Sequence, residues 1–119
     1  MTQHRELSEE RWSGFTLDQQ ILMIANEMNR ASRLLRSGDV VGTKSCYERV
    51  LRLTDLTVRV QTKSTLRREL LRWRGLIAEL YLEETTRADE HRRALRCLLY
   101  FTSEAARQIP YVCAVASDK

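Results

Sequence analysis

Proline and glycine are scarce in this sequence, with one proline and four glycines among 119 residues. Turn-rich β proteins use both residues heavily, so their scarcity argues against a β fold and favours long helices. The chain is 43% hydrophobic and 30% charged, which excludes a disordered acidic or low-complexity protein. We therefore predict one all-α domain over residues 1–119, long enough to bury a core without disulfides or metal.

Long apolar runs are missing as well. A run such as Ile21 to Ala25 falls far below the roughly 20 residues that a membrane-crossing helix needs. The first residues are charged where a signal peptide would be apolar. We expect a cytoplasmic protein without a membrane partner.

Cysteine offers little chemistry. The three cysteines are an odd number without a C-x-x-C pair, which argues against a disulfide framework or a zinc ribbon. None has a neighbouring histidine that would activate it as a thiolate. We expect Cys46, Cys97 and Cys113 to act as small core residues.

Enzyme motifs are absent too: the sequence has no glycine-rich phosphate loop, no H-E-x-x-H and no recognisable Ser-His-Asp frame. Neither His4 nor His91 has the glutamate three residues before it that a di-iron bundle needs. For His91, a packed histidine with one hydrogen bond is favoured over a functional imidazole. No catalytic residue, cofactor or metal is predicted.

Apolar residues are present at alternating spacings of three and four, the pattern of amphipathic helices in antiparallel bundles. The pattern predicts an up-down antiparallel four-helix bundle with helices over 17–37, 40–62, 65–85 and 87–108. The third segment has the widest apolar face. The residues on the densest seams of the third and fourth helices are expected to be core: Leu70, Trp73, Ile77, Leu98 and Phe101.

Capping residues indicate where the first two helices begin and end. The run Thr16 to Gln19 has the form of a capping box, Gly38 ends the first helix, and Asp39 is a natural N-cap for the second. A connection that short makes the two helices antiparallel neighbours.

The signals for the other two helices are similar in kind. Ser64 or Thr65 is expected to cap the third helix, and the run Thr86 to Asp89 has the form of a capping box for the fourth. Pro110 is expected to end the fourth helix.

Short segments flank the predicted bundle, which spans residues 16–109. In the N-terminal arm, residues 1–15, Ser8 is a candidate cap for one turn through Trp12, and Trp12 and Phe15 either dock the arm or anchor a partner. The C-terminal tail, residues 110–119, is apolar and β-prone, so it either docks on the bundle or is donated to a second subunit.

Charge is distributed unevenly around a formal net charge of +4. Residues 59–74 hold six basic residues and one acidic residue, whereas residues 79–90 hold five acidic residues and one basic residue. Such a dipolar surface suits self-association better than wrapping a phosphate backbone, with solvated helix faces as the alternative. Phosphate contacts, the less favoured reading, would use seven arginines: Arg67, Arg68, Arg72, Arg74, Arg92, Arg93 and Arg96.

The apolar band of the third helix is wider than one side of a four-helix core absorbs. Either the N-terminal arm covers the excess, or part of it faces another molecule in a symmetric homodimer. The predicted interface residues are Leu71, Leu76, Leu82, Tyr111 and Val112.

Two resemblances bear on function. In residues 31–55, the Gly38-Asp39 turn, the aromatic Tyr47 and Val50 are in register with the tetratricopeptide repeat, so this stretch resembles one hairpin of that family. The resemblance implies a helical hairpin suited to protein contacts.

The expected layout is also similar to the small bacterial bundles of the HEPN and nucleotidyltransferase-substrate-binding type. The nuclease members of that group carry an arginine and a histidine on their last long helix, and Arg87 and His91 are the nearest equivalents here. This resemblance implies an RNA- or nucleotide-related domain in a toxin-antitoxin pair, or a nucleotidyltransferase partner. The favoured function is a non-enzymatic helical interaction module that self-associates.

Overall fold

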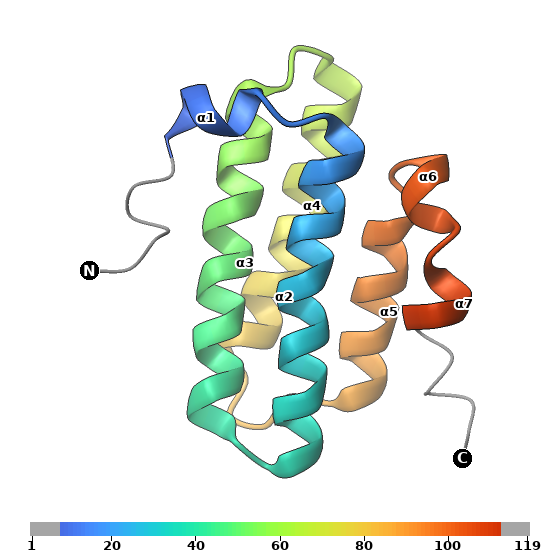
Figure 1. Ribbon diagram of the computed structural model, residues 1–119. Coiled ribbons are helices and arrows are strands. Elements are labelled where there is room, and N and C mark those ends of the chain that lie inside the picture. Colours follow the sequence, from blue (N-terminus) through green and yellow to red (C-terminus); the bar gives the residue numbers. More distant parts are fainter. Residues whose placement is uncertain (1–7, 113–119) are drawn as a thin grey trace.

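The computed structural model describes residues 8–112, and every regular element in that range is a helix. The longer helices are α2 (Leu17–Ser37), α3 (Val40–Val60), α4 (Ser64–Leu82) and α5 (Ala88–Leu99) (Figure 1). Three short helices flank them: α1 (Glu9–Ser13), α6 (Ser103–Ala106) and α7 (Ile109–Val112). The predicted all-α class is confirmed.

The long helices surround one apolar core. Helix α2 packs along α3 on one side and α5 on the other, while α4 packs against α3 and less extensively against α5. Four of the five predicted core residues are buried: Leu70, Trp73, Ile77 and Leu98. Phe101 is only partly buried, because it follows the end of α5 and packs against the edge of the core.

In the α2–α3 hairpin, the start and end of α2 and the start of α3 lie where the capping residues predict. The Thr16 hydroxyl accepts from the Gln19 backbone, and the Gln19 side chain accepts from the Thr16 backbone, which completes the capping box. Gly38 has φ 80°, a left-handed conformation that glycine adopts without steric cost. Asp39 then caps α3 by accepting from the Gly42 backbone at 2.9 Å.

The caps expected for α4 and α5 are wrong. Lys63 stands at the N-cap of α4 without a side-chain hydrogen bond, because Ser64 is already the first helical residue. Arg87 holds the same position at α5, and the Thr86 hydroxyl donates instead to the Leu80 carbonyl. The connections are also longer than predicted, since α3 ends at Val60 and α4 at Leu82.

The predicted fourth helix, 87–108, is broken. Helix α5 ends at Leu99, and Thr102 adopts an extended backbone from which its hydroxyl accepts from Ala105 and starts α6. A threonine side chain that caps a new turn competes with continuation of the preceding helix. Pro110 does not end a helix: it lies in the first turn of α7, where its missing N–H costs no hydrogen bond.

Residues 8–15, the described part of the N-terminal arm, dock on the long helices. Trp12 is 1% exposed, and its indole N–H donates to the Thr57 hydroxyl of α3 at 2.9 Å. Gln20 of α2 donates to the backbone carbonyls of Trp12 and Phe15, which fastens both ends of the connection. Trp12 is therefore a docking residue and not an anchor for a partner, whereas Phe15 stays partly exposed beside it.

The cysteines differ in burial. Cys46 is buried in the core as expected, but Cys97 on α5 is exposed, which contradicts the expectation for that residue. Cys113 lies outside the described residues.

Candidate interaction surface

The outer face of α4 carries a continuous apolar line. Leu71 is 51% exposed and Leu82 is 78% exposed, although both lie on a helix whose opposite face is buried in the core. Spacings of four, three and four residues keep side chains on one face of a helix. We call the residues that satisfy this spacing the α4 stripe: Leu71, Gly75, Ala78 and Leu82.

Gly75 is unusual within the stripe. It lies in the interior of α4, where glycine destabilises a helix by about 0.5–1 kcal/mol relative to alanine. A Cβ atom at Gly75 would meet no other element within 4 Å in the described residues, so packing within residues 8–112 does not require glycine here. The space above Gly75 is open.

The other predicted interface residues do not join this line. Leu76 is 45% exposed, but it lies about 140° around the helix from Leu71 at 100° per residue. Tyr111 is exposed on α7, which lies beyond α5 in Figure 1. The side chain of Val112 lies outside the described part of the chain. The N-terminal arm, as far as residues 8–15 show, packs on α3 and leaves the stripe exposed.

Charges along α4 run against the helix dipole. Its first turn has no acidic residue and is followed by Arg67 and Arg68, and its last turn has no basic residue but contains Glu79. Acidic groups stabilise the positive start of a helix and basic groups the negative end, so this order is the unfavourable one. Lys44 of α3 partly compensates by donating to the carbonyls of Tyr81 and Glu83.

The seven arginines proposed for phosphate contacts lie on α4 and α5, and two of them form ion pairs. Arg74 pairs with Asp55 of α3 at 2.6 Å, and Arg72 pairs with Glu69 at 3.2 Å. The other five are exposed on α4 and α5 and form no ion pair within residues 8–112: Arg67, Arg68, Arg92, Arg93 and Arg96. Consecutive residues point about 100° apart, so neighbouring arginines on one helix face different directions.

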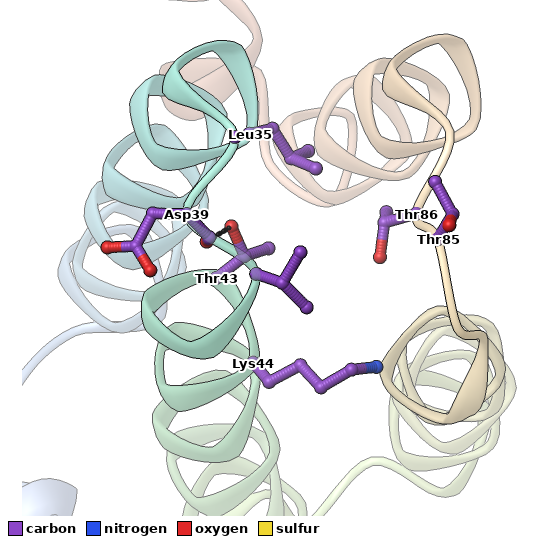
Figure 2. Close-up of a pocket in the computed structure, with 8 residues that line it drawn as sticks. Leu35, Asp39, Thr43, Lys44, Thr85 and Thr86 are labelled. Atoms are coloured by element: carbon purple, nitrogen blue, oxygen red, sulfur yellow. Dashed lines mark hydrogen bonds between the residues drawn. The ribbon is translucent and has the colours of Figure 1, made fainter.

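A cavity of about 120 Å³ lies between the α2–α3 turn and the α4–α5 connection (Figure 2). Thr43 donates to the Asp39 carbonyl at 2.7 Å, and Lys44 reaches the end of α4. The Asp39 carboxylate points away from the cavity in Figure 2. Because these polar groups are engaged with the chain's own backbone or turned outward, the cavity offers a ligand few polar contacts.

His91 is 1% exposed and takes part in a buried hydrogen-bond network. Its Nε2 lies 3.0 Å from the Met28 carbonyl, which only accepts, so Nε2 carries the proton and donates. Nδ1 therefore accepts from the Tyr47 hydroxyl at 2.6 Å, and the Ser32 hydroxyl lies 2.9 Å from Nε2. Burial lowers the pKa of His91 and raises the pKa of Tyr47, which keeps both side chains neutral.

This network corrects one expectation for His91. His91 is packed, as favoured, but with three polar neighbours instead of one. The Arg87 side chain is exposed and pairs with Asp89 and Glu90. The sequence singled out Tyr47 only as an aromatic residue of the tetratricopeptide-like hairpin. It did not indicate the hydrogen bond to His91, because the two residues are 44 positions apart.

Comparison with protein-family models, with curated proteins and with solved structures finds no match. The tetratricopeptide and HEPN resemblances therefore stay predictions. No helix in residues 8–112 is long and apolar enough to cross a membrane. In the same residues, no group of three or more His, Cys, Asp or Glu side chains is placed to hold a metal ion.

Proposed function

We propose that this chain is a non-enzymatic helical interaction module that self-associates as a homodimer through the outer face of α4. In this proposal α2 to α5 form the up-down antiparallel four-helix bundle that the apolar spacing predicts. The observation that carries the proposal is the α4 stripe, an exposed apolar line on a helix whose other face is already packed.

The exposed leucines supply the driving force. Fully burying a leucine side chain contributes about 1.5–3 kcal/mol, and in a two-fold dimer each contact is made twice. Leu82 at 78% exposure and Leu71 at 51% exposure would each contribute the part of this energy that corresponds to the surface still exposed. The adjoining charges add specificity, because both signs are present on the same helix.

The buried histidine favours a non-catalytic role. His91 is the only histidine in residues 8–112, and both of its ring nitrogens are engaged with the chain itself. A general acid or base has to reach the proton of a substrate, which a side chain enclosed between Tyr47 and Met28 does not do.

Light scattering tests the proposal. At tens of micromolar in physiological salt, the native chain should have twice the monomer mass of 14.0 kDa. Leu82→Lys should return it to the monomer mass, because a charge in the interface is desolvated without a partner. Val41→Lys is the matched control: Val41 is 79% exposed, close to the 78% of Leu82, but lies on α3. A native chain of monomer mass would overturn the proposal.

A second candidate is an HEPN-like RNA- or nucleotide-related domain, acting in a toxin-antitoxin pair or beside a nucleotidyltransferase. The observation that favours it is the set of five exposed arginines without an ion pair in the described residues, two of them near the positive start of α4. RNA affinity that falls steeply with ionic strength would support this candidate. Absence of binding at low salt would eliminate it.

A further inference from the structure

The outer face of α4 is complementary to the same face of a second α4 helix when the two helices run antiparallel. We infer that the α4 stripe is occupied by α4 of a second copy of this chain, running antiparallel and centred between Leu76 and Ile77. This inference rests on the proposed function and specifies its geometry. In this arrangement Leu71 packs on Leu82 of the partner subunit, and Gly75 packs on Ala78 of the partner subunit.

The spacing of the stripe is the first support. Its intervals of four, three and four residues read the same from either end, so a two-fold axis through the midpoint superposes the line on itself. The two small residues meet at the centre and the two leucines at the ends. Close approach of two helices requires small residues where the backbones cross.

The open space at Gly75 is the second support. Helical glycine weakens α4, and apart from the adjacent residues and the nearby backbone of α4 itself, no atom of the described residues lies within 4 Å of the place where a Cβ atom on Gly75 would stand. A close contact within residues 8–112 therefore does not explain the glycine. A neighbouring helix that approaches the Gly75 backbone would use this space. Ala78, one turn later and partly exposed, keeps the crossing narrow.

The charges select the antiparallel direction. The first half of α4 carries Arg67, Arg68 and Arg72 with Glu69 as its one acidic residue, and its end and the following residues carry Glu79, Glu83 and Glu84. In the antiparallel register the basic half of one helix lies along the acidic end of the other, whereas a parallel pair would bring like charges together.

The partner also corrects the dipole of α4. In this register the last turn of α4, which lacks a basic group, lies opposite Arg72 of the partner subunit. Within one chain, Lys44 provides such compensation at the carboxyl end, where it donates to the carbonyls of Tyr81 and Glu83. The antiparallel partner therefore adds favourable charge at the carboxyl end of α4.

Disulfide trapping tests the direction directly. In a background with Cys97→Ser and Cys113→Ser, one chain carries Leu71→Cys and another carries Leu82→Cys. Mixing them under mild oxidation should yield a covalent dimer, because these positions face each other. Each variant alone should yield at least tenfold less, since in this register equivalent residues are separated along the axis by eleven helical residues, about 16 Å.

Charge reversal provides an independent measurement if either cysteine weakens association. Arg68→Glu and Glu83→Lys should each raise the dimer dissociation constant at least tenfold, and the double variant should restore most of the native affinity. Arg92→Glu on α5 is the control for net charge and should leave the dissociation constant within twofold of the native value. A double variant no better than the single ones would overturn the antiparallel register.

The outcomes separate the two proposals. A native chain that stays monomeric in light scattering removes both. A dimer that Leu82→Lys dissociates, but in which each cysteine variant crosslinks with itself and not with the other, preserves the proposed function and overturns the antiparallel geometry. A dimer insensitive to Leu82→Lys locates the interface on another face of the molecule. This result would overturn both the proposed α4 interface and its antiparallel geometry.

Discussion

Buried polar side chains that hydrogen-bond between helices favour one arrangement of this core. His91 and Tyr47 come from different helices, and each satisfies a polar atom of the other at 2.6 Å. A buried donor or acceptor without a partner costs about 1–3 kcal/mol, so the network favours one arrangement of the helices over others. The same reasoning applies to Trp12, whose indole N–H finds Thr57.

Burial of His91 predicts a dependence of stability on pH. Its pKa in the folded state lies below the ordinary 6.5, so below that pH the unfolded chain binds more protons than the folded one. The contribution of neutral His91 is present above pH 6.5 and is lost as the pH falls from there toward the folded pKa. Urea unfolding across this range should show a falling free energy of unfolding, and His91→Gln should flatten this part of the curve. A slope unchanged by the substitution would contradict the assignment.

Trp73 is the largest buried side chain of α4. It is buried against α5, and its indole N–H donates to the Ala94 carbonyl at 2.8 Å. Trp73→Ala should lower the free energy of unfolding by about 3–5 kcal/mol, because the cavity and the lost hydrogen bond add. Thermal unfolding measures the change, with the exposed Arg93→Ala as control. Retention of the native melting temperature would show that the packing of α4 is not as described.

At the scale of elements, substitutions of two glycines, one at the C-cap of α2 and one inside α4, are predicted to have opposite effects. Gly38→Ala should destabilise the chain by about 1–2 kcal/mol, because φ 80° is unfavourable for a residue with a Cβ atom. Gly75→Ala should stabilise the isolated subunit by about 0.5–1 kcal/mol, because α4 gains helix propensity and the space is open. Chemical unfolding at low protein concentration, where the subunit is alone, measures both. Destabilisation by Gly75→Ala under these conditions would show that the position is constrained within one chain.

Some helix boundaries lie where the local capping signals predict, and others do not. The Thr16 box and the Gly38-Asp39 turn involve atoms within four residues, and both form as predicted. Ser64 is of a residue type that often caps helices, but it is the first helical residue of α4. Thr102 caps α6, within a segment that the periodicity predicted as one continuous helix. Capping residues mark candidate starts, and packing decides which of them are used.

At the scale of the whole molecule, association should appear in thermal unfolding. A dimer gains stability by mass action, so the melting temperature of the native chain should rise with protein concentration from micromolar to hundreds of micromolar. Leu82→Lys should give a melting temperature that does not depend on concentration, and Val41→Lys should behave like the native chain. A native melting temperature independent of concentration would contradict the proposed dimer.

The sequence by itself determined the all-α class, the α2–α3 hairpin and most of the core. These features depend on contacts between residues three or four apart, or on caps and turns that the chain forms with its near neighbours. Leu70, Trp73 and Ile77 were identifiable as core because each lies on the face with the densest apolar spacing.

Only the tertiary structure decided how distant residues meet. The partners of His91, Trp12 and Lys44 lie 37 to 63 positions away in the sequence, and no local pattern connects them. The candidate surface shows the same division: the sequence indicated excess apolar residues on α4, but which leucines remain exposed depends on where α3 and α5 cover that helix. Periodicity describes the faces of a helix, whereas the packing of its neighbours decides which face stays free.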